Sequence, residues 1–166
     1  MKNILIVSVT SGNNYKLAQE LETVLKTKKI NYNLIKLDDF SIPLYHPKIE
    51  KTTEIENISK LDDLFQNADG FIFCAPEYNG SIPPILTNVI AWISVKSLNW
   101  RGAFNEKSAL ICTHSGGAGN NFINSLRIQL NHLGVIVLPR GISKTDTDPL
   151  KEESVSKILD QLISIT

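Results

Sequence analysis

Three short stretches of the chain combine glycine or proline with hydroxyl, amide and aromatic side chains, a mixture that suits ligand binding. The most informative is 76–84, which contains Pro76-Glu77-Tyr78-Asn79-Gly80. Pro76 stiffens the turn, Asn79-Gly80 can expose backbone amides at positive φ, and Tyr78 offers an aromatic face. Such a loop suits a flat ring system that forms hydrogen bonds. The alternative is a proline-rich turn that only caps a helix.

The first of the three stretches suits a terminal phosphate. Its polar side chains and its glycine lead directly into a helical pattern, where backbone amides are free to bind an anion. The candidate residues are Thr10, Ser11, Gly12, Asn13, Asn14 and Tyr15. Their spacing fits neither Gly-x-x-x-x-Gly-Lys-Ser/Thr nor Gly-x-Gly-x-x-Gly, which excludes a nucleotide triphosphatase loop and a Rossmann fingerprint. An ordinary polar helix cap is the alternative.

The third stretch, 114–121, is rich in glycine and therefore permits close backbone contact with a ligand. Its candidate binding residues are His114, Ser115, Gly116 and Gly117. His114 is also a possible auxiliary catalytic residue, because an imidazole can donate to a bound ring or act on an acceptor oxygen. A purely structural histidine is the alternative reading. No residue stands out as a certain catalytic group.

These stretches are expected to follow the strands of a parallel sheet. Apolar runs predict strands at 4–8, 32–37, 71–75, 109–113 and 135–138, and helical spacing predicts helices at 14–28, 54–68, 84–94, 122–133 and 155–163. The strict alternation predicts a three-layer α/β/α domain with a five-stranded parallel sheet in the flavodoxin-like order 2-1-3-4-5. Strands 1, 3 and 4 are neighbours in that order, so the three stretches are expected to share one crevice. The segments 40–53 and 95–107 are expected to be rim loops or interface arms.

Composition narrows the classes of function. The 166 residues, 42% of them apolar, fit a single domain over 1–166, and 17 basic against 17 acidic residues argue against nucleic acid as a partner. No apolar run is long enough to cross a membrane, and the amino-terminal residues do not resemble a signal peptide. Cys74 and Cys112 are expected to be reduced core thiols of a cytoplasmic protein. No metal-ligand cluster, Ser-His-Asp set or paired carboxylate stands out, so no metal site is expected.

The motifs resemble those of one family. Pro76–Pro83 with Asn88 and Trp92, and Ser115-Gly116-Gly117 with Gln129-Leu130, Leu133-Gly134 and Pro139, resemble the NAD(P)H-dependent FMN reductases of the flavodoxin-like class. That family includes quinone, azo-dye and chromate reductases, and the resemblance covers nearly the whole chain. The first stretch departs from the family. Ser8-Val9-Thr10-Ser11 lacks the arginine of the usual Gly-Ser-x-Arg start and is closer to the Thr-Gly-Asn-Thr loop of flavodoxins.

The resemblance implies an enzyme that holds FMN, as a prosthetic group or a substrate, in the three stretches. NADPH or NADH would donate hydride, and small acceptors such as quinones, azo dyes or free flavin would receive two electrons in ping-pong order. It also implies a homodimer, or a tetramer. Trp92, Ile93 and Val95 are candidate interface residues, and filling the chain's own core is the alternative role for such side chains. A flavodoxin-type electron carrier is one alternative, although such carriers are expected to be strongly acidic. A flavin-binding regulatory protein without turnover is the other.

Overall fold

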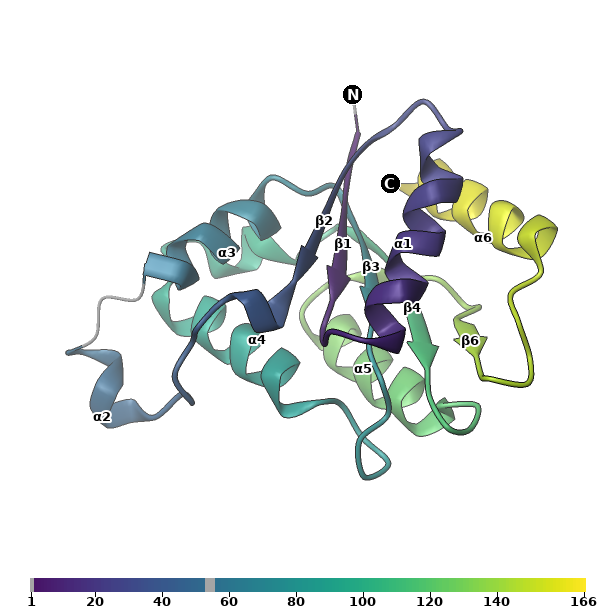
Figure 1. Cartoon of the computed structure of the whole chain (residues 1–166). Helices are drawn as coiled ribbons and strands as arrows, with labels where there is room; N and C mark the ends of the chain where they lie inside the picture. The colour runs from purple at the N-terminus through teal and green to yellow at the C-terminus, as the bar shows by residue number, and fades with distance from the viewer. Residues whose placement is uncertain (1, 53–55) are drawn as a thin grey trace.

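A parallel β-sheet lies between two layers of helices in the computed structural model, which describes residues 2–52 and 56–166 (Figure 1). The strands are β1 (Asn3–Ser8), β2 (Asn31–Lys36), β3 (Gly70–Cys74), β4 (Ser108–His114), β5 (Ile136–Val137) and β6 (Ile142–Lys144). The helices are α1 (Asn13–Lys26), α2 (Pro47–Glu50), α3 (Glu56–Gln66), α4 (Pro84–Lys96), α5 (Asn120–His132) and α6 (Glu152–Ile165). Residues 54 and 55 of the helix expected at 54–68 lie outside the described residues.

The strand order β2-β1-β3-β4-β5 is the predicted one, and every pairing of these strands is parallel. The strand predicted at 135–138 is present as β5, which pairs with β4 at Ser108 and Ala109. The sheet has a sixth strand that the sequence did not predict, β6, which pairs with β4 from Cys112 to His114. Pro139 between β5 and β6 cannot donate to a ladder hydrogen bond, which explains the interruption. Gly141 then passes so close to β4 that a Cβ there would lie 3.0 Å from the Ile111 carbonyl oxygen.

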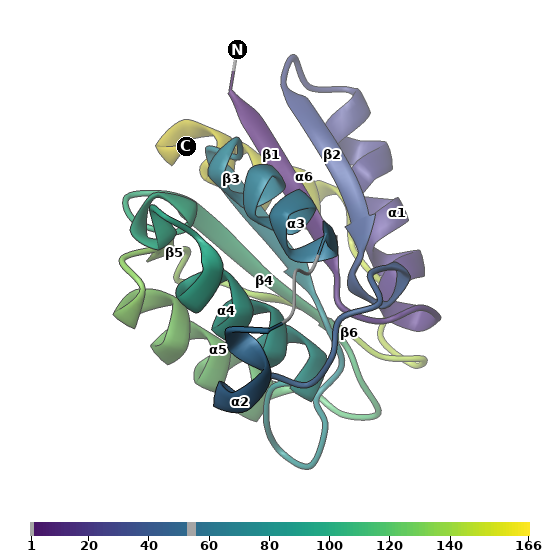
Figure 2. The ribbon, with the colours of Figure 1, turned by 90° about the vertical axis from the view of Figure 1, so that its left-hand side faces the viewer.

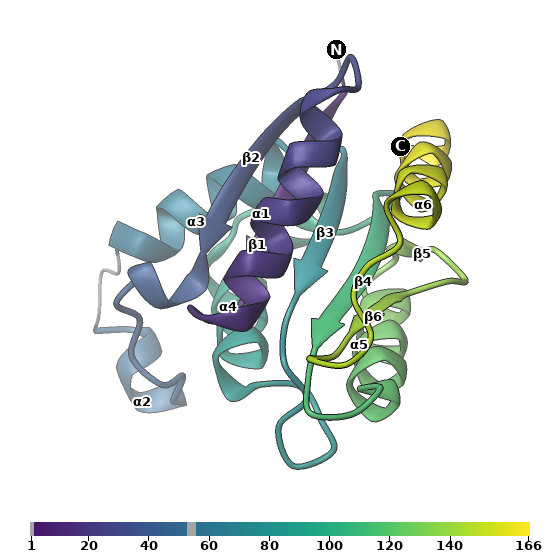
Figure 3. The ribbon, with the colours of Figure 1, turned by 45° about the vertical axis from the view of Figure 1, so that its right-hand side comes forward.

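Alternate residues of the central strands face the two helical layers, as the pleat requires. Leu5, Val7, Phe71 and Phe73 belong to the larger core, which α3, α4 and α5 cover on one face (Figure 2). Ile4, Ile6, Ile72 and Leu110 belong to the second core, which α1 and α6 cover on the other face (Figure 3). Among the described residues, no helix is both long and apolar enough to cross a bilayer.

The segments expected to be polar rim loops carry parts of the core. Trp92 of α4 is fully buried, and its Nε1 donates to the Pro43 carbonyl oxygen at 2.8 Å. The Tyr45 N–H donates to Asn88 Oδ1 at 2.7 Å, so the chain before α2 packs against α4. In the second segment, Phe104 is fully buried as well. Of the two roles left open by the sequence, an interface anchor or a core residue, Trp92 therefore has the second.

The two cysteines lie directly opposite each other in β3 and β4. Both are fully buried free thiols. Burial, together with the neighbouring Cys74 thiol, raises the pKa of the Cys112 thiol well above its ordinary value. Such a thiol stays protonated at neutral pH and is a poor nucleophile. This agrees with the expectation that the pair serves as core packing.

Candidate functional site

The three predicted stretches meet in one cavity of about 320 Å³ at the carboxyl edge of the sheet. We name them loop 1 (residues 9–12, before α1), loop 2 (75–83, before α4) and loop 3 (115–119, before α5). The lining residues are Thr10, Ser11, Asn13, Asn14, Pro76, Glu77, Tyr78, His114, Ser115, Gly116 and Asp146. All but Asp146 were predicted from the sequence, and the expectation that the stretches share one crevice is confirmed. Other hollows of similar volume exist, but this is where the three loops meet.

Five predicted residues lie outside the lining. Gly12 precedes the first turn of α1 with φ 91°, a conformation that favours glycine. Asn79 and Gly80 form the tip of loop 2, with φ 50° and 69°. The residues on either side, Tyr78 and Ser81, form two backbone hydrogen bonds, in each of which the N–H of one residue donates to the carbonyl oxygen of the other. The ring of Tyr15 lies beneath the Lys36 ammonium, 5.3 Å from it, and Gly117 follows Gly116 in loop 3.

Loop 1 and loop 3 are joined by the side chain of Asn14, which is only 3% exposed. Its Nδ2 donates to the His114 carbonyl oxygen at 2.8 Å, and its Oδ1 accepts from the His114 N–H at 2.8 Å. Both ends of the amide are therefore used within the chain. The side chain of Asn14 acts as a structural bridge, while its backbone amide remains in the open first turn of α1.

Loop 2 and loop 3 are joined by Glu77. Its N–H donates to Ser115 Oγ at 2.8 Å, and its Oε2 accepts from the Phe122 N–H at 3.0 Å. Phe122 lies in the first turn of α5, so the carboxylate caps that helix from a different loop. Ser115 Oγ also lies 2.8 Å from Thr113 Oγ1. These bonds fix the walls of the cavity relative to each other.

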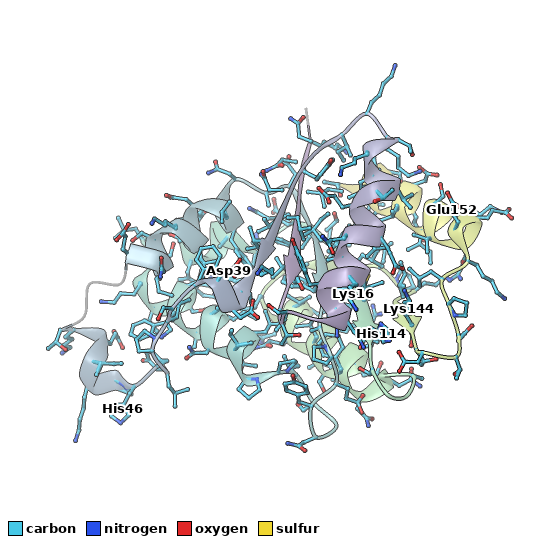
Figure 4. The ribbon with its side chains drawn as sticks, viewed as in Figure 1. Lys16, Asp39, His46, His114, Lys144 and Glu152 are labelled. Atoms are coloured by element: carbon cyan, nitrogen blue, oxygen red, sulfur yellow. The ribbon has the colours of Figure 1, made fainter. Side chains whose placement is uncertain are left out.

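His114 is the last residue of β4, and its Nε2 lies 3.0 Å from Asp146 Oδ1. The His114 side chain is 11% exposed, whereas that of Asp146 is 89% exposed. Figure 4 shows His114 and Lys144 near the amino-terminal end of α1, and Lys144 forms an ion pair with Glu20 at 2.5 Å. Sequence reasoning missed Asp146 because it follows β6, a strand that the sequence did not predict. The histidine therefore faces the cavity with an acidic partner.

The electrostatics of loop 1 differ from those of a simple anion site. The N–H and Oγ of Ser11 both donate to Asp38 Oδ2, at 2.8 and 2.6 Å. Partial burial tends to raise the pKa of Asp38, but these two bonds and the charge of Lys36 outweigh it and hold the pKa below its ordinary value. Asp38 was also missed from the sequence. Among the described residues that line the cavity, none is lysine or arginine.

No group of three or more histidine, cysteine, aspartate or glutamate side chains able to hold a metal ion occurs in residues 2–52 and 56–166. The cavity offers a ligand hydrogen-bonding groups and the imidazole of His114. Backbone amides at the start of α1, an aromatic face at Tyr78 and open space beside Gly116 surround it. This arrangement suits a flat ring with a phosphate at one end.

A comparison with family models decides which proteins the chain is related to. The model described as NADPH-dependent FMN reductase matches residues 1–148. The chain belongs to this family. FMN and NADPH are thus the cofactors that the family description names, and the resemblance predicted from the motifs of loops 2 and 3 is confirmed.

Two curated proteins are similar to this chain of the FMN reductase family over part of their length. An NADPH azoreductase of Bacillus sp. (strain OY1-2) is 28% identical over 102 residues, 61% of this chain and 54% of that protein. An FMN-dependent NADH:quinone oxidoreductase of Clostridium perfringens is 31% identical over 100 residues, 56% of this chain and 50% of that protein. The chain spans about half the length of these relatives.

Several solved structures have a fold similar to that of this chain over nearly its whole length. The flavoenzyme NAD(P)H:(acceptor) oxidoreductase FerB of Paracoccus denitrificans has a TM-score of 0.81 at 18% identity, covering 99% of this chain and 96% of that one. The apo form of an NADH:FMN oxidoreductase, EmoB, has a TM-score of 0.76 at 19% identity, covering 100% and 91%. A flavodoxin from the domain Archaea has a TM-score of 0.68 at 12% identity, covering 99% of each chain. These likenesses confirm the flavodoxin-like fold.

Proposed function

We propose that this chain is an NAD(P)H-dependent FMN reductase that passes two electrons to small acceptors such as quinones, azo dyes or free flavin. The observation that carries the proposal is the convergence of loops 1, 2 and 3 on one cavity, in a chain of the FMN reductase family. Bound FMN would supply the redox chemistry, accepting hydride from NAD(P)H and giving electrons to the acceptor. The protein would supply binding and position.

Two groups of residues would hold FMN, one at its phosphate and one at its ring. Thr10, Asn13 and the first-turn amides of α1 would bind the phosphate, because these donors face the cavity at a helix amino terminus. Loops 2 and 3 would bind the ring through backbone groups and Tyr78. The bridges made by Asn14 and Glu77 support this assignment, since they hold the three loops in one arrangement. A preformed cavity binds a rigid ring with little ordering cost.

Beyond binding, His114 would help turnover without being essential to it. Its imidazole faces the cavity and contacts Asp146, so it can donate a hydrogen bond to the ring edge or to an acceptor oxygen. Donor and acceptor would enter the cavity in turn, which would give ping-pong kinetics. Replacing His114 with alanine is therefore expected to slow turnover and not to abolish it.

We also propose that the protein is a cytoplasmic homodimer. The reduced, buried thiols of Cys74 and Cys112 support the compartment. Val95 in the last turn of α4 and Leu98 just after that helix support an interface, because both are exposed apolar side chains and Leu98 is fully exposed. Light scattering at micromolar concentration measures the assembly. A monomer that retains full activity would contradict the dimer.

The decisive experiment for the reductase is anaerobic mixing. The full chain is loaded with FMN and mixed with NADPH or NADH while the flavin absorbance is followed. Loss of the oxidised flavin band with either nucleotide, and its return when a quinone is added, is the expected result. If dithionite bleaches the band and neither nucleotide does, the protein is an electron carrier or a flavin-binding regulator, and the proposed function is wrong.

A further inference from the structure

An acidic side chain of the chain itself is bound to loop 1. Asp38 lies in the 3₁₀ turn Leu37–Asp39 that directly follows β2. Because β2 and β1 are neighbouring parallel strands, this turn and loop 1 lie at the same edge of the sheet. Figure 4 labels Asp39, which marks the turn. The short bonds from the Ser11 N–H and Oγ to Asp38 Oδ2 have the lengths of charge-assisted hydrogen bonds.

The two Ser11 donors are of the kind that a phosphate would use. Ser11 lines the cavity, and it immediately precedes Gly12 and the open first turn of α1. A phosphate monoester carries a charge of about −1.5 to −2 at pH 7. The phosphate must therefore either displace Asp38 from Ser11 or bind beside a second anion. Both alternatives lower the affinity, the first through lost hydrogen bonds and the second through like-charge repulsion.

Lys36 compensates the charge of Asp38 only in part. Lys36 Nζ lies 2.8 Å from Asp39 Oδ1 and over the ring of Tyr15, so the lysine is already engaged with another carboxylate. The bonds from Ser11, with the charge of Lys36, outweigh partial burial and keep the pKa of Asp38 low, so the carboxylate stays ionised at neutral pH. Since the lining itself contains no lysine or arginine among the described residues, the phosphate would meet a negative neighbour that Lys36 compensates only in part.

We propose that Asp38 competes with the FMN phosphate for loop 1, and that this competition makes FMN a weakly held, exchangeable substrate of the enzyme. The inference rests on the proposed function only in taking FMN as the ligand of the cavity. Asp38 acts through Ser11 and is an affinity-determining residue, not a catalytic one. Its effect is specific to the phosphate end of the ligand, because Asp38 itself does not line the cavity that receives the ring.

The test compares FMN with riboflavin, which has the same ring and no phosphate. The purified full chain, freed of flavin, is titrated with each compound, and quenching of flavin fluorescence gives the dissociation constants. Asp38→Asn keeps an oxygen acceptor for Ser11 and removes the charge. We expect it to tighten FMN about tenfold, equivalent to about 1.4 kcal/mol, and to leave riboflavin unchanged. Asp63→Asn on α3 makes the same change in net charge beside a different hollow, and should alter neither constant.

Two results would overturn the inference. One is an Asp38→Asn protein whose FMN affinity is unchanged or weaker; the other is equal tightening of FMN and riboflavin, which would mean a change in loop shape. Asp38→Ala provides a second variant, and weaker FMN binding there would show that Asp38 supports the loop instead of competing. The reductase assay is separate. Flavin that binds but is not reduced by NAD(P)H contradicts the proposed function, whereas an active enzyme with no gain from Asp38→Asn contradicts only this inference.

Discussion

Asn13 and Asn14 are adjacent residues of the same type with different environments. Asn13 is exposed and lines the cavity, whereas the Asn14 side chain is buried and bonded at both ends to the His114 backbone. We therefore expect Asn14→Ala to lower the free energy of unfolding by about 2 kcal/mol, because the partly buried N–H and carbonyl oxygen of His114 both lose their partner. Urea unfolding monitored by tryptophan fluorescence measures this loss.

The matched variant is Asn13→Ala. It should leave the free energy of unfolding nearly unchanged and weaken FMN by about tenfold, or about 1.4 kcal/mol, by removing a donor from the proposed phosphate end. Fluorescence titration gives the FMN affinity of both variants. Equal stability losses at the two positions would contradict the assignment of Asn14 as the bridge.

At the level of single residues, the sequence indicated which side chains line the cavity. It did not indicate which groups of the chain each of them contacts. Ten of the cavity residues follow from loop composition and strand order alone. The sequence could not show that Asn14 bridges to residue 114 or that Ser11 faces Asp38, since these contacts depend on how loops from different strands approach. Asp38 was hidden for the same reason: it follows β2, whose end carries no glycine-rich or proline-rich signal.

Among the elements, α5 depends on a group from another loop for its amino-terminal cap. Glu77 of loop 2 accepts from the Phe122 N–H, while Gly119 before the helix has no side chain to do so. Glu77→Ala should therefore cost about 1 kcal/mol of stability and speed hydrogen exchange at the Phe122 amide. Glu77→Gln keeps an oxygen acceptor, so hydrogen exchange at the Phe122 amide should be slower in this variant than in the alanine variant. Exchange measured by NMR that is the same in all three proteins would exclude the cap.

The carboxyl end of α3 is capped by Lys107, whose Nζ donates to the carbonyl oxygens of Phe65 at 2.5 Å and Gln66 at 2.8 Å. Burial lowers the pKa of Lys107 from 10.5 to about 8. Between pH 8 and 10.5 the unfolded chain thus binds more protons at this lysine than the folded chain does, so its contribution to stability rises with pH. Below pH 8 the lysine is protonated in both states, and the cost of burying its charge is fully present.

This pH dependence is measured as a difference between proteins. The free energy of unfolding of the parent chain minus that of Lys107→Met should increase between pH 8 and 10, because only the parent carries the buried amine. Lys157→Met on α6 is the control, since that side chain is 72% exposed. A difference that stays flat with pH, or falls, would contradict the lowered pKa. Urea titrations at pH 7, 8.5 and 10 suffice.

For the molecule as a whole, the alternation of apolar strands and amphipathic helices was enough to predict the fold and the strand order. Each central strand is buried on both faces, so its apolar run is continuous and easily recognised. The additional strand β6 was missed, because its three residues are too few to produce such a run. The sequence left the role of Trp92 open between interface and core, because only the folded chain shows that residues 43–45 cover it.

The bridge between Asn14 and His114 has a consequence for biosynthesis. The two residues are separated by 100 positions in the chain. A ribosome adds about 5–20 residues per second, so Asn14 emerges some 5–20 seconds before its partner has been made. Until then, the side-chain amide of Asn14 can form hydrogen bonds only with water and not with His114. The pocket is thus a late product of translation, and a nascent chain that ends before residue 114 should gain α1 and β1 without gaining any affinity for flavin.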